Sequence, residues 1–279
     1  MSVPEGTILP SCRLCGGPGT VWFERPRQVL RCQSCTALYA STDQRVQEFT
    51  EAYYRGGVYS DYLADEPAIR RTAAARLRRL ERRVAGRTLL DVGCATGFFL
   101  EAARARAWTA TGVDVSRYAT DVARGRGCDA LTGSIDQAVP SGRRFAVVTL
   151  WDTIEHLDDV KATLAVAREL LLPGGILALS TGDAGSVFAR ATGAHWRLLQ
   201  DPTHRVFFTE QALRRLLERV GFRVAEVSRR GKWVSTAMIL HHSSIGAAAH
   251  LARWCVRARV NPMVYVNLGD VMTVISVPA

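Results

Sequence analysis

From Arg87 to the end of the chain, short apolar runs alternate with segments of helical periodicity, and this alternation constrains the fold more than any other feature. Alternating strands and helices predict an α/β domain with a parallel sheet and crossover helices. One run, residues 145–151, is almost entirely apolar, as expected of a strand buried on both faces. The expected strands are residues 88–92, 108–115, 129–132, 145–151, 176–180, 222–227 and 271–277.

The remaining periodic segments predict helices before and between these strands. Helices are expected at residues 43–54, 67–84, 97–107, from 116 onward, at 158–172 (ended by Pro173-Gly174-Gly175), at 210–220 (capped by Thr209) and at 233–258. We therefore divide the chain into a cysteine-rich module (1–42), a helical linker (43–86) and a main domain (87–279) with a helical insertion at about 231–262.

The segment 89–100 passes from an apolar strand, through small residues, into a helix. Small residues allow a ligand to lie against the backbone, and the carboxyl ends of parallel strands are where such folds bind ligands. Asp114 ends the next strand, 23 residues after Asp91. From that position a carboxylate can bind both hydroxyls of a ribose.

The spacing of this turn argues against a dinucleotide cofactor. Its frame runs Asp91-x-Gly93-x-x-x-Gly97, whereas the dinucleotide fingerprint needs three glycines to admit a pyrophosphate. A carboxylate at Asp91 would repel a pyrophosphate but would attract a ligand that carries an ammonium and a sulfonium. The sequence therefore favours a sulfonium cofactor.

Four ordered motifs, residues 91–99, 112–116, 148–156 and 170–175, resemble those of Rossmann-like (class I) S-adenosylmethionine (SAM)-dependent methyltransferases. The resemblance covers about residue 87 to the end and implies a seven-stranded sheet with helices on both faces and an antiparallel last strand. One departure is Ala95, where many members carry glycine. By resemblance, the SAM-binding residues are Asp91, Gly93, Cys94, Ala95, Thr96, Gly97 and Phe98 in the turn, Asp114 and Val115 at the ribose, Ser134 and Ile135 at the adenine, and Trp151 and Asp152 closing the pocket.

Four of the seven cysteines form two tight pairs in the N-terminal module. Cys12-x2-Cys15 and Cys32-x2-Cys35 are separated by sixteen residues, a spacing typical of a four-cysteine zinc site. Gly16-Gly17 suits the sharp turn of a metal-binding loop. Because four thiolates leave no position for water, the predicted zinc ribbon has a structural metal.

Two histidines are candidates for a general base. His156 follows the fourth strand of the main domain and is preceded by Glu155, and His204 lies in the segment 194–208, beyond the fifth strand. The alternative for His156 is that it only leads into the next helix. The alternative for His204 is a role in folding.

The methyl acceptor is expected to be a small molecule, and the alternative is ribosomal or transfer RNA. The net charge of +10 favours RNA, but Lys161 and Lys232 are the only lysines, so the charge reflects an arginine-rich composition. Neither a secretory signal nor a membrane span is found in the sequence, which predicts a cytoplasmic bacterial enzyme without a membrane partner. The sequence does not predict the oligomeric state.

Overall fold

The computed structural model describes residues 9–25, 27–41, 65–241 and 261–279 of the 279-residue chain. The chain forms two compact units. The first comprises residues 1–46, 150–229 and 269–279, and the second comprises 47–149 and 230–268. The helix expected at residues 43–54 lies outside the described residues. Within the described part, no helix is long and apolar enough to cross a membrane.

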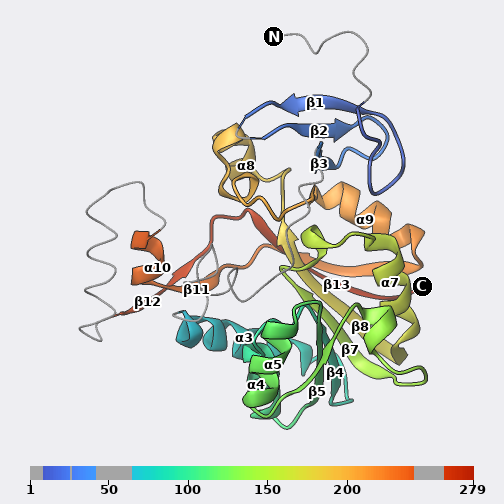
Figure 1. Ribbon diagram of the computed structural model, residues 1–279, viewed down its shortest axis with the longest axis vertical. Helices are drawn as coiled ribbons and strands as arrows, with labels where there is room; N and C mark the ends of the chain where they lie inside the picture. Colours follow the sequence, from blue (N-terminus) through green and yellow to red (C-terminus); the bar gives the residue numbers. More distant parts are fainter. Residues whose placement is uncertain (1–8, 26, 42–64, 242–260) are drawn as a thin grey trace. The chain divides into compact units, whose positions relative to one another are not determined.

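A seven-stranded sheet with the strand order β10-β13-β8-β7-β4-β5-β6 confirms the fold expected from the motifs (Figure 1). Strand β4 pairs in parallel with β5 and β7, and β5 pairs in parallel with β6. The last strand, β13, is antiparallel to both of its neighbours, β8 and β10. The strands are β4 (Thr88–Val92), β5 (Thr109–Asp114), β6 (Asp129–Thr132), β7 (Phe145–Trp151), β8 (Leu171–Gly182), β10 (Phe222–Ser228) and β13 (Val271–Pro278).

Polar residues cap most of the longer helices between these strands. Ser116, Asp159, Ser186 and Thr209 each accept a hydrogen bond from the backbone N–H three residues later, which satisfies a donor that the helix itself cannot. The helices are α3 (Glu66–Leu80), α4 (Phe98–Arg104), α5 (Arg117–Gly125), α6 (Ile135–Ala138), α7 (Val160–Glu169), α8 (Val187–Thr192), α9 (Glu210–Arg219) and α10 (Thr236–His241), with the 3-10 helices Ile154–His156, Gly193–His195 and Arg197–Leu199.

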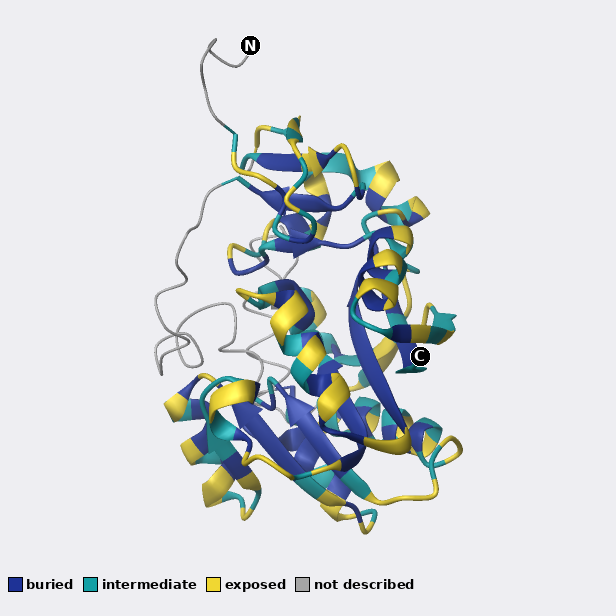
Figure 2. Cartoon of the chain, turned by 90° about the vertical axis from the view of Figure 1, so that its right-hand side faces the viewer, coloured by how far each residue is buried: buried dark blue, intermediate teal, exposed yellow. Residues whose placement is uncertain are grey.

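The central strands form the core of the sheet. Leu89, Leu90, Val147, Val148 and Leu150 have no exposed surface, and the strands of the sheet are drawn largely in the colour of buried residues in Figure 2. Burial on both faces explains why β7 is apolar at almost every position.

The connection between α7 and β8 differs from the expectation. Helix α7 ends at Glu169 and strand β8 already begins at Leu171, so Pro173-Gly174-Gly175 belongs to the strand and does not end the helix. Residues 172–174 are exposed at the start of β8. There a proline can lack its N–H without leaving a buried carbonyl unpaired.

The helix predicted for residues 233–258 starts later than expected, at Thr236, because residues 232–235 form a strand. Strand β11 (Lys232–Ser235) pairs with β12 (Met263–Val266), and only α10 between them is helical among the described residues. Trp233 lies opposite Tyr265, with their ring centroids 5.6 Å apart. Aromatic and β-branched side chains pair well across strands, and this preference overrode the helical spacing. Residues 242–260 lie outside the described part.

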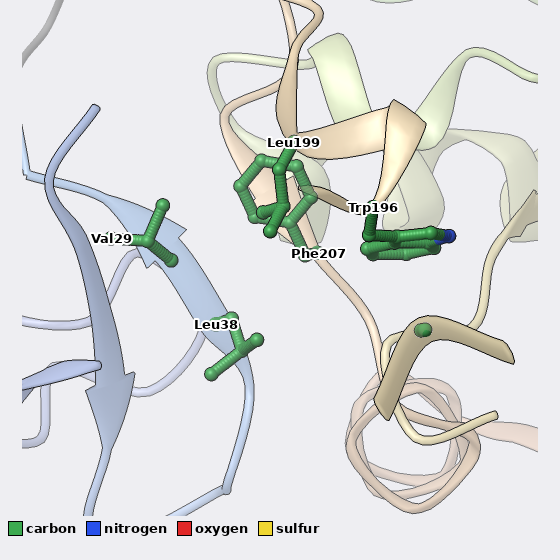
Figure 3. Close-up of a cluster of buried hydrophobic side chains, with 6 residues drawn as sticks. Val29, Leu38, Trp196, Leu199 and Phe207 are labelled. Atoms are coloured by element: carbon green, nitrogen blue, oxygen red, sulfur yellow. The ribbon is translucent and has the colours of Figure 1, made fainter. Parts of the chain in front are cut away.

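The cysteine-rich module folds as three short strands, β1 (Gly19–Phe23), β2 (Val29–Cys32) and β3 (Leu38–Ala40). A fourth strand, β9 (Val206–Phe207), comes from the main part of the chain and completes this sheet in the order β1-β2-β3-β9. The apolar side chains beneath it come from both segments: Val29 and Leu38 face Trp196, Leu199 and Phe207 (Figure 3). The module and residues 196–207 therefore share one hydrophobic core.

Candidate functional site

The four paired cysteines gather at one point of the N-terminal module. The Sγ atoms of Cys12 and Cys35 are 3.6 Å apart, and those of Cys15 and Cys32 are 3.4 Å apart. All four sulfur atoms lie within 4.8 Å of one another. The backbone N–H groups of Leu14 and Cys35 point at Cys12 Sγ and Cys32 Sγ, each at 3.4 Å. Such a cluster fits the four thiolates of a tetrahedral zinc site.

The glycines beside Cys15 have the geometric role that the sequence suggested. Gly16 has φ +73°, in the left-handed region that favours glycine. A Cβ atom on Gly17 would lie 2.4 Å from Ser34 Oγ. The two metal-binding loops can therefore approach one another only because Gly17 has no side chain.

Three residues of the turn between β4 and α4 have left-handed backbone conformations. Gly93, Ala95 and Gly97 have φ angles of +77°, +47° and +87°. A Cβ atom on Gly97 would lie 2.9 Å from the Cβ of Ala123 in α5. Ala95 adopts its left-handed conformation at a cost of about 1–2 kcal/mol, which explains why glycine is common there in the family.

Asp114 connects this turn to the start of α5. Its Oδ2 accepts a hydrogen bond from the backbone N–H of Ala95 and its Oδ1 accepts one from Ser116, both at 2.9 Å. Burial raises the pKa of Asp114, and these two hydrogen bonds oppose that rise. Because a carboxylate offers about four acceptor positions, each oxygen can still accept a hydroxyl of a ribose.

Asp91, by contrast, is enclosed by protein. It is 3 % exposed and accepts a hydrogen bond of 2.6 Å from Thr149 Oγ1. Burial raises the pKa of Asp91 to about 7. The sequence predicted a charged carboxylate here, and the structure makes that charge dependent on pH. A cationic ligand beside Asp91 would favour the ionised form.

Two of the predicted cofactor residues have buried side-chain oxygens without a hydrogen-bond partner among the described residues, and these test whether the site can bind SAM. Thr96 Oγ1 and Ser134 Oγ are buried without a hydrogen-bond partner in the described part of the chain. Buried polar atoms are normally paired, so unpaired ones near a small-residue turn fit a site that binds a polar ligand. The ring of Phe98 is fully buried and is contacted by the guanidinium groups of Arg70 and Arg126.

The other predicted cofactor residues differ widely in exposure. Cys94 and Ile135 are almost fully buried, whereas Val115 is 60 % exposed. In the other unit, Trp151 is partly exposed, and Asp152 has φ +52°. The backbone N–H of Asp152 donates to Ser180 O at 3.0 Å, and its Oδ1 accepts from Ser180 Oγ at 2.9 Å, so Asp152 is fixed to β8.

The structure brings the two candidate histidines together. The ring centroids of His156 and His204 are 4.7 Å apart, and donor atoms of both histidines and of Glu155 lie within 4.8 Å of one another. We call these three residues the histidine cluster. Oε2 of Glu155 is buried without a hydrogen-bond partner among the described residues. A proton or a cation can be held at such a cluster.

Backbone carbonyls set the tautomers of the two histidines. Nδ1 of His156 lies 3.2 Å from Thr203 O, and Nδ1 of His204 lies 2.9 Å from Leu198 O. A carbonyl oxygen only accepts hydrogen bonds, so each neutral ring carries its proton on Nδ1 and its lone pair on Nε2. Thr203 and Leu198 were not found by sequence reasoning, because a backbone contact leaves no motif.

Burial favours the neutral form of both imidazoles, and Asp201, whose Oδ2 lies 3.6 Å from His204 Nε2, opposes this effect. Burial lowers the pKa of His156, and it lowers the pKa of His204 to about 4, with His156 as the next contribution. Burial also raises the pKa of Glu155 to about 8, with Asp152 as the next contribution. A neutral imidazole is the form that a general base needs. A group with a pKa of about 4 is a weak base, so His204 stays the second candidate.

Trp196, in the segment 194–208, is packed in the interior of the protein. Trp196 is 2 % exposed, and its Nε1–H donates to Asp270 Oδ2 at 2.9 Å. The ring of Trp196 belongs to the hydrophobic core shared with the N-terminal module. The sequence did not show this packing, because Val29 and Leu38 of the module lie more than 150 residues before Trp196.

Solved structures confirm the fold. The protein is similar to a SAM-dependent methyltransferase of Archaeoglobus fulgidus, with a TM-score of 0.52 and 19 % identity, covering 77 % of this chain and 98 % of that one. It is also similar to the CcbJ methyltransferase of Streptomyces caelestis, with a TM-score of 0.52 and 16 % identity, covering 76 % and 90 % of the two chains. These likenesses define a class I methyltransferase fold.

Sequence relatives identify the family. The profile of the family described as "Methyltransferase domain" matches residues 64–227. The ubiquinone biosynthesis O-methyltransferase of Thiobacillus denitrificans is 32 % identical over 158 residues, which cover 52 % of this chain and 68 % of the relative. The enzyme of the same name in Aromatoleum aromaticum is 30 % identical over 157 residues, covering 52 % and 67 %. The chain belongs to the methyltransferase family and is a SAM-dependent methyltransferase.

Proposed function

We propose that this enzyme transfers a methyl group from SAM to a hydroxyl oxygen of a small-molecule acceptor. The observation that carries the proposal is the histidine cluster, in which the rings of His156 and His204 lie 4.7 Å apart beside the buried carboxyl group of Glu155, and burial lowers the pKa of both imidazoles. A hydroxyl acceptor must lose its proton, and a neutral imidazole can take it. The name of the relatives, ubiquinone biosynthesis O-methyltransferase, agrees with a hydroxyl acceptor.

The cofactor supplies a methyl group that is already activated by its sulfonium. In the proposed site, the ribose hydroxyls donate to Asp114, and the carboxylate of Asp91 offsets the positive charge. Thr96 Oγ1 and Ser134 Oγ could bind SAM, since neither has a hydrogen-bond partner among the described residues. The full proposed set also contains Gly93, Cys94, Ala95, Gly97, Phe98, Val115, Ile135, Trp151 and Asp152.

His156 is the proposed general base, and His204 is the second candidate. Nε2 of His156 takes the proton of the acceptor hydroxyl as the oxygen forms its bond to the methyl carbon. When bound, SAM would supply the activated methyl group that this oxygen accepts. The carbonyl of Thr203 holds the His156 ring in the tautomer that this step needs.

The zinc ion itself and the domain division are further parts of the proposal. Cys12, Cys15, Cys32 and Cys35 would hold one structural Zn²⁺ as thiolates. Residues 1–42 would form the ribbon, 43–86 a linker that covers the cofactor, and 87–279 the methyltransferase domain, with about 231–262 covering the acceptor. Four clustered thiols require a reducing compartment, which supports a cytoplasmic location.

RNA is the second candidate acceptor, and the net charge of +10 favours it. Several arginines, however, are engaged by acidic side chains: Arg70 pairs with Glu101 at 2.7 Å, and Arg106 pairs with Glu81 at 2.6 Å. Paired arginines contribute less to binding phosphates than unpaired ones. We therefore favour the small-molecule acceptor.

Transfer of an isotope-labelled methyl group tests both candidates. Phenols and catechols, amine metabolites and bulk ribosomal RNA are offered separately, and RNA binding is measured at two salt concentrations. Label in a phenolic oxygen supports the proposal. Label in RNA, together with binding that weakens steeply with salt, would replace it with the second candidate.

A further inference from the structure

A continuous run of hydrogen bonds leads from the N-terminal module to the histidine cluster. Strand β3 pairs with β9, and the backbone N–H of Ala40 donates to Arg205 O at 3.0 Å. The N–H of Arg205 in turn donates to Glu155 O at 2.9 Å. Arg205 is thus held on one side by the module and on the other by the residue that precedes His156.

A side chain of the module provides a second connection. Nη1 of Arg27, in the turn between β1 and β2, donates to Pro202 O at 3.1 Å, and its guanidinium lies 5.0 Å from the centroid of the Phe207 ring. Nε and Nη2 of Arg27 are buried without a hydrogen-bond partner among the described residues. Arg27 therefore anchors the peptide that lies between Asp201 and Thr203.

The loop anchored by Arg27 is the one that holds the histidines. Asp201 Oδ1 accepts hydrogen bonds from Thr203 N at 2.9 Å and Thr203 Oγ1 at 2.6 Å, which makes the loop a tight turn. Thr203 O and Oγ1 contact His156 Nδ1 at 3.2 and 3.0 Å. His204 is the next residue, and its ring packs on His156 and on Phe207.

The cysteine cluster lies at the start of the hydrogen-bonded connection, in the loop between β2 and β3. Cys32 ends β2, and Cys35 lies three residues before β3. The backbone N–H of Cys32 donates to Ala37 O at 2.9 Å. A metal that joins Cys32 to Cys35 would therefore fix the loop that sets β3 against β2, and β3 against β9.

We propose that the zinc ribbon positions the histidine cluster, with Arg27 and strand β3 as the positioning elements. Metal binding to the four cysteines would then change the position of the His156 ring, and β3, Arg205 and the 201–204 loop would transmit this change. Arg27 is a positioning residue, because it acts on the histidines through Pro202 and Thr203. The effect on turnover rests on the proposed role of His156, whereas the effect on histidine geometry does not.

The test uses the full-length, zinc-loaded protein with ¹⁵N-labelled histidine. We expect ring signals of His156 and His204 that show one tautomer each, with the proton on Nδ1. Arg27→Met removes the charge and the donor while keeping similar bulk, and it should shift both sets of signals toward a tautomer mixture. Arg27→Lys should restore them in part. Arg25→Met, an exposed arginine of the same turn, is the matched control and should leave the signals unchanged.

Kinetics provide the second readout. Arg27→Met should lower kcat by more than it changes the KM for SAM, because Asp91, Asp114 and Ser134, proposed to bind SAM, belong to the other unit. Removal of zinc with a chelator should change the histidine signals in the same direction as Arg27→Met while SAM binding persists. If zinc removal unfolds the chain, Leu38→Ala, which weakens the contact between β3 and β9 with the cysteines intact, takes its place.

Two results would overturn the inference. The first is an unchanged histidine spectrum in Arg27→Met and Leu38→Ala. The second is a spectrum of the folded, zinc-free protein that matches the zinc-loaded one. A failure of the proposed function gives a different result. In that case His156→Asn keeps full turnover, independently of how Arg27→Met changes the ring signals.

Discussion

Replacing Asp114 with asparagine tests the cofactor site with a nearly isosteric change. Both carboxylate oxygens accept backbone N–H bonds of 2.9 Å, from Ala95 and Ser116. Asparagine has one acceptor oxygen, so its amide NH₂ must face one of these two N–H groups. The loss of a hydrogen bond to a charged group costs about 1.5–3 kcal/mol. The free energy of unfolding of Asp114→Asn should fall by about this amount.

SAM affinity should fall in the same variant, because a ribose hydroxyl loses its charged acceptor. A loss of about 1.5–3 kcal/mol corresponds to roughly a 10- to 150-fold increase in Kd. Isothermal titration calorimetry with SAM measures the affinity, and denaturant melts separate it from the loss of stability. Titration with NADH should give no binding.

Asp129→Asn is the matched control. Asp129 lies on the adjacent strand β6, is about half exposed, and accepts a hydrogen bond of 2.7 Å from Thr111 Oγ1. Its replacement should leave the Kd for SAM unchanged. If Asp114→Asn also binds SAM with wild-type affinity in its folded state, Asp114 does not hold the ribose and the assignment of the cofactor site is refuted.

Three further predictions concern the metal, the base and the dependence of stability on pH. Elemental analysis should find about one zinc per chain, and Cys32→Ser should lose the metal and destabilise the ribbon; a metal-free protein from zinc-replete cells would contradict this. His156→Asn should lower kcat by about 10²–10⁴-fold at unchanged SAM affinity, with a smaller effect for His204→Asn; wild-type turnover in both would exclude a histidine base. The pKa values of Asp91 (about 7) and Glu155 (about 8) lie above the ordinary values of 3.8 and 4.5, so these carboxyl groups bind more protons in the folded state, and the free energy of unfolding should fall as pH rises from about 6.5 to 8; below about 6.5 the lowered pKa values of His156 and His204 act in the opposite direction. Denaturant melts at several pH values should show this fall, and a smaller one in Glu155→Gln; equal slopes in the two proteins would contradict it.

Local signals allowed the sequence to predict the strands of the sheet closely. Strands β4, β6 and β7 have the predicted ends, because each is an apolar run between turn residues. The spacing of the paired cysteines is equally local, and their sulfur atoms do lie together. Where burial and a short-range motif agree, a single stretch of the sequence is enough to predict the local structure.

Contacts between distant segments could not be predicted in this way. The pairing of Leu38 with Phe207 involves two very short strands, and neither carries a signal for its partner. The same holds for Trp233 and Tyr265, whose pairing places residues 233–235 of the expected helix in strand β11, while Thr236–His241 is helical. The proximity of His156 and His204 depends on the loop that β9 follows, so sequence reasoning found both residues but not their contact.

The place of β13 in the sheet determines the order in which the protein can fold. Strand β13 lies between β8 and β10 and pairs with both, yet it is the last of the three to leave the ribosome. Until residues 271–278 are available, β8 and β10 each present an unpaired edge, and such edges promote association between nascent chains. Completion of the sheet is therefore a late, non-local event in folding, which should make the yield of folded enzyme sensitive to the rate of translation and to chaperones.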